Sequence, residues 1–309
     1  MRILITGVSG LLGNNLAWYF RGKNLVMGFY NTHPVCFAEI ECQKVDLLDV
    51  PVLGKWVQKF EPEVVIHCAG LTNLDFCEKN QEAAFAANVK ATRNLVATLK
   101  GSSAKLVYIS SDAVYDGKNG NYREEDPVEP MNYYGRTKYE GERESERHGN
   151  ALILRTNIFG WNVLPKESLA EWMVSTLMRK ELLRGFSDAF FSPIYTFDMA
   201  SILERCLQKN LRGLYHCGSS TSLSKYEFVL QLSRYFGLDA SLVQPCSRDE
   251  VPLAAKRGKN LSLCSDRLSK ALDVPFPSMK ESIKNFHRDF ERGLPAKIKK
   301  ECLTFRKKN

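Results

Sequence analysis

The sequence predicts an α/β fold in which helices cover both faces of a doubly wound parallel sheet. Short apolar runs that suit buried strands alternate with helix-like segments through the first half of the chain. A glycine-rich turn joins the first of these runs to the first helix-like segment. Of the 309 residues 44% are hydrophobic, which is enough for a substantial core.

The elements of the first half follow one another as strand, helix and strand. Arg2–Ile5 has the apolar content of a buried strand, and Leu16–Phe20 suits a buried helix. Regular alternation of this kind gives a parallel sheet, whose ligands bind beyond the carboxyl ends of the strands. The further elements expected here are strands at Leu25–Tyr30, Lys44–Asp46, Val64–Cys68, Leu106–Ile109 and Ala151–Leu154, and helices at Val50–Phe60, Glu82–Lys100 and Asn132–His148.

The second half is less regular but still apolar. Leu169–Lys180 and Lys225–Phe236 have the pattern of helices, and Gly213–Cys217 that of a short strand. We therefore expect residues 1–160 to form the sheet domain. Residues 161–309 should form mainly a smaller C-terminal lobe, with some segments returning to the sheet.

Composition excludes several classes of protein. The net charge is +8, much of it in a basic tail, but no basic–aromatic motif indicates a nucleic-acid partner. No apolar run approaches the ~20 residues of a membrane span, and no secretory signal is expected. Nine cysteines without a C-x-x-C pair predict reduced thiols in a cytoplasmic protein. The five histidines are scattered, so no metal site is expected.

The turn after the first strand has the glycine spacing G-x-x-G-x-x-G. Such a turn lets the backbone approach a phosphate, and the following helix offers free N–H groups to a pyrophosphate. A tight structural turn is the alternative reading. We take residues 1–160 as a Rossmann-type dinucleotide-binding domain and residues 161–309 as the substrate lobe. The candidate contacts in the turn are Gly7, Ser9, Gly10, Leu11, Leu12 and Gly13.

Tyr134 and Lys138 stand one helical turn apart and are the candidate catalytic pair. A nearby ammonium lowers the pKa of a phenol, so the pair could exchange a proton with a carbonyl near neutral pH. Spacing alone is weak, since Tyr19 and Lys23 share it and Tyr19 suits a packing role. Ser111 strengthens the interpretation, because it follows a buried strand and its hydroxyl could hold a substrate carbonyl; a helix cap is its alternative role.

These motifs resemble the extended short-chain dehydrogenases/reductases, and within them the dTDP-4-dehydrorhamnose reductase-like branch of sugar-nucleotide enzymes. The resemblance covers most of the chain. It rests on the three glycines, on Asp46-Leu47, on segments 67–75 and 87–89, on Ser110-Ser111-Asp112-Ala113-Val114-Tyr115-Asp116-Gly117, on Tyr134-Gly135-Arg136-Thr137-Lys138, and on segments 154–156, 192–195 and 257–260.

The resemblance implies a role for each matching residue. Tyr134 is the general acid for the sugar keto oxygen, Ser111 polarises the carbonyl, and Lys138 tunes Tyr134 and holds the nicotinamide ribose. Two positions depart from the branch: Ala113 replaces an aromatic residue and Gly258 a proline. The implied cofactor contacts beyond the glycine turn are Asp46, Leu47, Cys68, Ala69 and Gly70, with Tyr134 and Lys138, and the implied substrate contacts are Asp112, Asn157 and Arg257.

Cofactor preference depends on the end of the second strand. An acid there selects NAD by binding the ribose 2′-hydroxyl, whereas a nearby arginine favours NADP. Segment 29–33 holds neither, and Ser9, Asn31 and Thr32 could donate to a 2′-phosphate. We therefore favour NADP(H) slightly over NAD(H).

The expected function is NAD(P)H-dependent reduction of a nucleotide-linked 4-keto-6-deoxy sugar. One alternative is a non-catalytic nucleotide-binding regulatory subunit, because the regulatory subunit of methionine adenosyltransferase belongs to the same branch. A sugar-nucleotide 4-epimerase is another. Dehydration is disfavoured, because Ala113 stands where the related 4,6-dehydratases carry a catalytic glutamate. The expected partner is a nucleotide sugar, with neither nucleic acid nor membrane, and a homodimer is a possible assembly.

Overall fold

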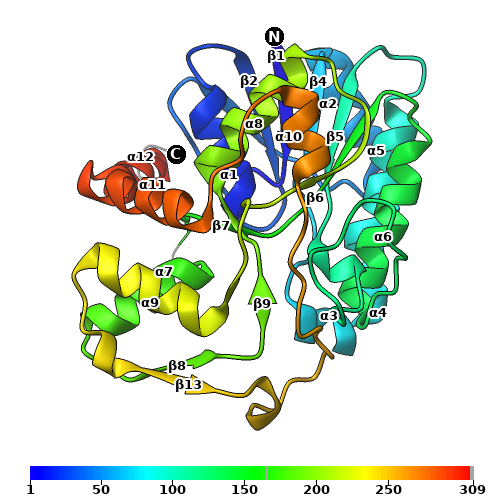
Figure 1. Cartoon of the computed structure of the whole chain (residues 1–309). Helices are drawn as coiled ribbons and strands as arrows, with labels where there is room; N and C mark the ends of the chain where they lie inside the picture. The colour runs from blue at the N-terminus through cyan, green and yellow to red at the C-terminus, as the bar shows by residue number, and fades with distance from the viewer. Residues whose placement is uncertain (165, 307–309) are drawn as a thin grey trace.

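The central sheet has seven parallel strands, and the expected doubly wound α/β fold is confirmed (Figure 1). This computed structural model describes residues 1–164 and 166–306. The strand order is β11-β6-β5-β4-β1-β2-β3. The strands span Arg2–Thr6 (β1), Leu25–Tyr30 (β2), Ile40–Lys44 (β3), Val64–His67 (β4), Lys105–Ile109 (β5), Ala151–Thr156 (β6) and Gly213–Cys217 (β11).

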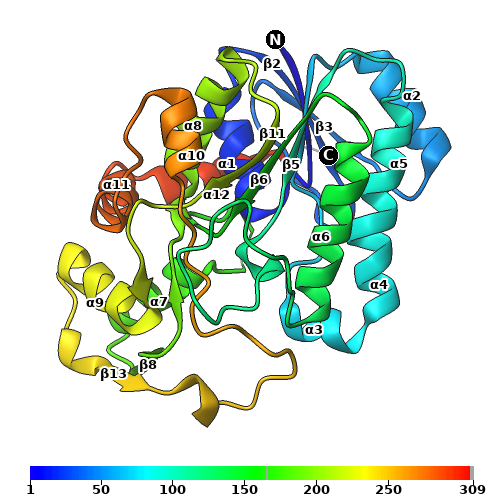
Figure 2. The same ribbon diagram turned by 45° about the vertical axis from the view of Figure 1, so that its right-hand side comes forward.

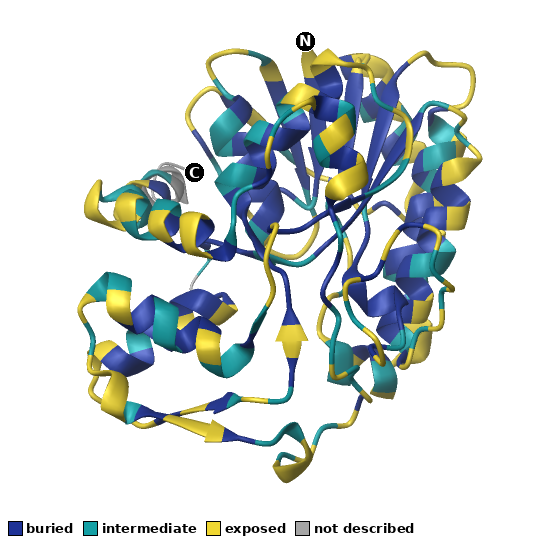
Figure 3. Ribbon diagram, in the orientation of Figure 1, coloured by how far each residue is buried: buried dark blue, intermediate teal, exposed yellow. Residues whose placement is uncertain are grey.

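Successive residues of the inner strands face opposite layers of helices, which explains why these strands are almost wholly apolar. Ile3 and Ile5 of β1 pack in the core beneath α1, α8 and α10, whereas Leu4 packs beneath α2 and α5. Figure 2 shows the two layers, and in Figure 3 the strands between them are buried. The helices are α1 (Leu11–Phe20), α8 (Thr196–Gln208) and α10 (Asp266–Leu272) on one face, and α2 (Val50–Phe60), α5 (Ala91–Thr98) and α6 (Tyr133–Glu146) on the other.

Two elements of the first half differ from expectation. The third strand ends at Lys44, where it was expected to begin, because Ile40–Lys44 is a half-exposed edge strand with little apolar content. The single helix expected at 82–100 is divided into α4 (Gln81–Phe85), a π-helical turn (Ala86–Lys90) and α5. A short helix, α3 (Leu74–Lys79), precedes them and was not expected.

The second lobe has a core of its own, rich in aromatic residues. Phe228, Phe286 and Phe159 lie at its centre, and their rings pack edge to face. The chain reaches this lobe after β7 (Ile158–Phe159) and returns to the sheet domain through α8, β11 and α10 (Figure 1). Its elements are α7 (Leu169–Met178), β8 (Leu183–Phe186), β9 (Phe190–Phe191), β10 (Ile194–Tyr195), β12 (Leu223–Ser224), α9 (Lys225–Phe236), β13 (Val243–Cys246) and α11 (Met279–Glu291).

A last helix, α12 (Leu294–Arg306), packs back against the sheet domain. Ile298 is fully buried in the core that contains α1, and the Glu301 carboxylate accepts hydrogen bonds from Arg21 and from the Ala38 backbone. Within the described residues, every helix is too short or too polar to cross a membrane.

Candidate active site

The glycine turn is built by close backbone contacts. Gly7 has a φ of +69°, and a Cβ there would lie 2.7 Å from the backbone of Ala69 after β4. A Cβ on Gly13 would lie 2.2 Å from the Gly7 carbonyl oxygen. Gly10 is different, because its Cβ would meet only that carbonyl, at 3.3 Å. Internal packing therefore explains Gly7 and Gly13, whereas Gly10 is exposed at the surface of the turn.

The first turn of α1 fits a pyrophosphate. Gly10 is the N-cap and has no side chain to cap the helix, and no acidic residue stands in the first turn. The N-terminal N–H groups and the positive end of the helix dipole therefore face outward without a competing carboxylate. Ser9 and Leu11 are half-buried beside this end, and Leu12 is in the core.

The other expected cofactor contacts lie at the carboxyl ends of strands that are neighbours in the sheet. Asn31 is exposed directly after β2, and Asp46 is exposed after β3, where its carboxylate accepts the Leu48 N–H at 2.9 Å. Leu47 is buried. The structure thus places these residues at the edge that carries the glycine turn, together with Cys68, Ala69 and Gly70 after β4.

Tyr134 and Lys138 lie in the first turns of α6, and both are buried. Asn132 caps this helix by accepting the Gly135 N–H at 2.9 Å. Gly135 lets the helix lie against the segment after β5, because a Cβ there would meet the Ala113 carbonyl oxygen at 2.0 Å. Close packing therefore fixes Tyr134 beside the end of β5.

Ser111 follows this end of β5 and has the capping role that was its alternative. Its hydroxyl accepts the Ala113 N–H at 3.1 Å, as the cap of a short 3₁₀ turn, and donates to the Asp112 carboxylate at 3.0 Å. The Ser111 hydroxyl acts on the pKa of Tyr134, so the two expected catalytic hydroxyls lie near each other.

The expectation that Lys138 lowers the pKa of Tyr134 is wrong for the structure. Burial raises the pKa of Tyr134 above its usual value, the Ser111 hydroxyl opposes this rise, and the Asp112 charge adds to it. Desolvation outweighs the attraction of any cation, because a phenolate loses its hydration in this pocket. Tyr134 is therefore a protonated phenol at neutral pH, the form that can give a proton.

Lys138 is shifted in the opposite direction. Burial lowers the pKa of its ammonium to about 8, while the charge of Glu142 raises it. Its Nζ lies 4.2 Å from the centre of the Tyr108 ring, which favours the cation. The charged form is thus retained at neutral pH, but with a small margin.

The expected substrate residues form two separate contacts. The Asn157 amide donates to Asp112 at 2.7 Å, and burial raises the pKa of Asp112 to about 6. Arg257 is half-buried and pairs with Asp75 at 3.0 Å. Asp75 also accepts the Ala255 N–H at 2.8 Å, so the Arg257 segment is fastened to α3.

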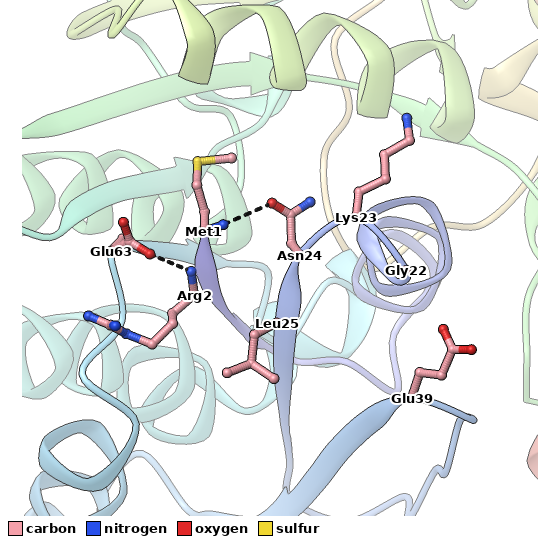
Figure 4. Close-up of a pocket in the computed structure, with 8 residues that line it drawn as sticks. All are labelled: Met1, Arg2, Gly22, Lys23, Asn24, Leu25, Glu39 and Glu63. Atoms are coloured by element: carbon pink, nitrogen blue, oxygen red, sulfur yellow. Dashed lines mark hydrogen bonds between the residues drawn. The ribbon is translucent and has the colours of Figure 1, made fainter.

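A hollow at the opposite edge of the sheet carries none of these groups. It surrounds the amino-terminal ends of β1 and β2, where Arg2 donates to Glu63 and the N-terminus to Asn24 (Figure 4). Parallel sheets bind ligands at the other edge, so we assign it no role.

Sequence reasoning missed three residues. Asn88 in the π-helical turn donates to Thr137 at 2.9 Å and exchanges hydrogen bonds with the Leu71 backbone, so it ties α6 to the segment after β4. Glu142, one turn beyond Lys138, was visible from spacing. Lys225 opens α9 in the second lobe, and the charges of Asp112 and Arg257 both act on it; no sequence signal linked it to the site.

Comparisons of this sequence with family models and with known proteins point to the same family. The family model of the RmlD substrate binding domain matches residues 1–292. Methionine adenosyltransferase 2 subunit beta of Danio rerio is 33% identical over 300 residues, covering 92% of this chain and 89% of that protein. The probable low-salt glycan biosynthesis reductase of Haloferax volcanii is 26% identical, covering 92% of this chain and 96% of that protein.

A solved structure agrees over almost the whole chain. The dTDP-4-dehydrorhamnose reductase of Bacillus anthracis, in complex with NADP, superposes with a TM-score of 0.83 at 27% identity and covers 93% of this chain and 99% of that one. The expected resemblance is thereby confirmed. With its sheet and nearly all of its length matched in this way, the chain belongs to the RmlD substrate binding domain family, within the extended short-chain dehydrogenases/reductases.

Proposed function

We propose that this protein reduces the keto group of a nucleotide-linked 4-keto-6-deoxy sugar with a nicotinamide dinucleotide. The observation that carries the proposal is the meeting of Ser111, Tyr134 and Lys138 at the sheet edge that also bears the glycine turn. Tyr134 and Lys138 stand one turn apart on α6, and α6 packs against the segment after β5 that carries Ser111.

Each of the three has a distinct task. The cofactor supplies a hydride to the carbonyl carbon when bound. Tyr134, a protonated phenol, gives its proton to the oxygen, and the Ser111 hydroxyl turns from Asp112 to donate its hydrogen bond to the same oxygen. Lys138 holds the ribose and stabilises the phenolate that remains, which regains a proton from solvent.

We assign four residues to the sugar nucleotide: Asp112, Asn157, Arg257 and Lys225. The Asp112–Asn157 pair stands beside Ser111, where sugar hydroxyls would meet it. Lys225 and Arg257 bring positive charge from the second lobe to the same region, which suits a diphosphate. We favour NADP(H), because the exposed Asn31 and Thr32 offer donors and no carboxylate to a 2′-phosphate.

A regulatory subunit is the second candidate function. It is favoured by the 33% identity to a methionine adenosyltransferase subunit, against 26% to the glycan biosynthesis reductase. Such a protein would bind the dinucleotide through the same turn and act through a partner enzyme. A 4-epimerase is a third candidate and would keep its cofactor through turnover.

The test is to mix the purified protein with NADPH and a panel of nucleotide-linked 4-keto sugars and follow nicotinamide absorbance. We expect cofactor oxidation with at least one sugar. A parallel experiment adds a methionine adenosyltransferase catalytic subunit. It measures whether the two proteins co-elute and whether the rate of that catalytic subunit changes. Binding of that subunit with no sugar reduced would replace the reductase proposal with the regulatory one.

A further inference from the structure

Glu142 makes one of the most buried polar networks of the described chain, and no role in the reaction has been given to it. Its side chain is 3% exposed, as is that of Arg155. Arg155 donates to both carboxylate oxygens, at 2.9 and 2.7 Å, and the Ser110 hydroxyl donates to Oε1 at 2.5 Å. Glu142 therefore carries its charge inside the protein, held by a bidentate pair.

The network joins the three elements that build the site. Glu142 belongs to α6, Ser110 directly follows β5 and precedes Ser111, and Arg155 belongs to β6. Arg155 also donates to the Tyr115 hydroxyl at 2.7 Å, so the segment after Ser111 is included. A shift of the carboxylate would move the helix of Lys138 relative to the strand end of Ser111.

Stability alone does not account for this arrangement. A buried ion pair gains little over well-packed apolar residues, because desolvation of both ions offsets their attraction. Glu142 lies one helical turn from Lys138, and its charge acts on that ammonium. The Glu142–Arg155 pair thus matters to the site through where it holds the Glu142 carboxylate, rather than through the stability that it adds.

We propose that Glu142, held by Arg155 and Ser110, is a positioning residue that sets Lys138 against Ser111 and supplies the negative charge facing the Lys138 ammonium. The effect on turnover rests on the proposed reductase function. The effect on Lys138 itself does not, because it is a property of the protein alone.

The other groups around Lys138 are neutral. His67 on β4 is buried, which lowers its pKa to about 3. Burial raises the pKa of the Cys68 thiol to about 12 and that of Tyr108 well above its usual range. Tyr134 is protonated for the same reason. Among these groups on α6, β4 and β5, Glu142 is the one that carries charge at neutral pH.

The sign of the effect follows. Burial lowers the pKa of Lys138 to about 8 and Glu142 opposes it. Without the Glu142 charge the pKa falls further, so Lys138 loses its proton at a lower pH. Cofactor affinity that depends on the ammonium should then be preserved at pH 6 and lost as the pH rises.

The experiment compares Glu142→Gln with Glu144→Gln. Glu144 is a matched control on the same helix, 7% exposed at its side chain and paired with Arg93 and Arg147. NADPH affinity is measured by fluorescence from pH 6 to 9, and Lys138 is titrated directly by NMR of labelled lysine. For Glu142→Gln we expect the alkaline loss of affinity to move down by about one pH unit. Because the pKa of Lys138 in the wild type is about 8, this shift weakens binding roughly fivefold at pH 8 and about tenfold at pH 9. Glu144→Gln should match the wild type.

A second variant separates position from charge. Ser110→Ala removes one hydrogen bond and leaves the Glu142–Arg155 pair intact. We therefore expect kcat to fall, while KM and the pH profile stay unchanged. An unshifted Lys138 titration in Glu142→Gln, or a loss of affinity equal at every pH, would overturn the inference. If the wild type reduces no sugar but the Lys138 titration moves as expected, the proposed function fails and the electrostatic role of Glu142 stands.

Discussion

Replacing Tyr134 with phenylalanine removes one oxygen atom and leaves the ring in its packing place. The ring contacts the small core around Cys77 and Ala113, which the change does not touch. Ser111 keeps its hydrogen bond to Asp112 at 3.0 Å. The free energy of unfolding should therefore fall by less than about 1 kcal/mol. The proton donor is lost, which costs ~10²–10⁴-fold in kcat.

Tyr19→Phe is the matched control, since Tyr19 has the same spacing to Lys23. The Tyr19 hydroxyl donates to Glu204 at 2.7 Å in a half-buried place far from Ser111. Loss of this hydrogen bond should lower the free energy of unfolding by about 1 kcal/mol. This is less than is usual for a bond to a charged group, because water can replace the Tyr19 hydroxyl at this half-buried place. Tyr19→Phe should thus lower the melting temperature by a few degrees and leave kcat unchanged.

The assay measures kcat and KM for the reduced sugar, NADPH affinity by fluorescence, and thermal unfolding for all three proteins. We expect Tyr134→Phe to lose turnover, and Tyr19→Phe to lose only stability. If Tyr134→Phe keeps turnover within a few-fold of the wild type, the proton comes from elsewhere and the assignment is wrong.

Three further predictions concern the cofactor turn and Asp112. Gly10→Val should weaken NADPH binding at least tenfold with a small change in melting temperature. Gly13→Ala should instead destabilise the fold, because its Cβ would lie 2.2 Å from the backbone. Fluorescence titration measures the affinity for NADPH, and circular dichroism measures the melting temperature. Asn31→Asp should weaken NADPH more than NADH through like-charge repulsion, and a wild type that already prefers NADH tenfold would contradict this. Burial raises the pKa of Asp112 to about 6, so its contribution to stability is present below its unfolded pKa and lost as pH rises through 6. Asp112→Asn removes this titration but also one of the two acceptor oxygens that Asn157 and Ser111 use. Between pH 4 and pH 7.5 the wild type should therefore lose about 2 kcal/mol of stability relative to the variant, measured by denaturant unfolding at both pH values.

The sheet was predictable because its strands are buried on both faces. Residues 64–66 and 106–109 are continuous apolar runs, and such runs between helical segments leave few alternatives. Ile40–Lys44 was misplaced for the opposite reason: an edge strand exposes alternate residues and has no distinct pattern. The π-helical turn at Ala86–Lys90 has no pattern in the sequence, and its Asn88 is tied to Thr137 by a tertiary contact that only the folded chain shows.

The candidate site was predictable where one segment carries it. Tyr134 and Lys138 are fixed by helical spacing, and Ser111 by its place after a strand. The direction of the Tyr134 pKa was wrong, because burial depends on packing from Ala113 and Cys77 that spacing does not reveal. Lys225 lies 91 residues beyond Tyr134 in another lobe, and only the folded arrangement brings its charge toward Asp112.

The return of α8, β11 and α12 to the sheet domain has a consequence for how the molecule is made. The apolar face of α1 is covered by α8, and Ile298 of α12 is sealed in the same core. As the ribosome releases residues 1–160, the glycine turn and α1 emerge without this cover and β6 without its neighbour β11. This core can therefore be completed only after translation has passed residue 298. Until then the apolar face of α1 is exposed and prone to aggregation. We therefore expect a chaperone to bind the nascent chain during this interval.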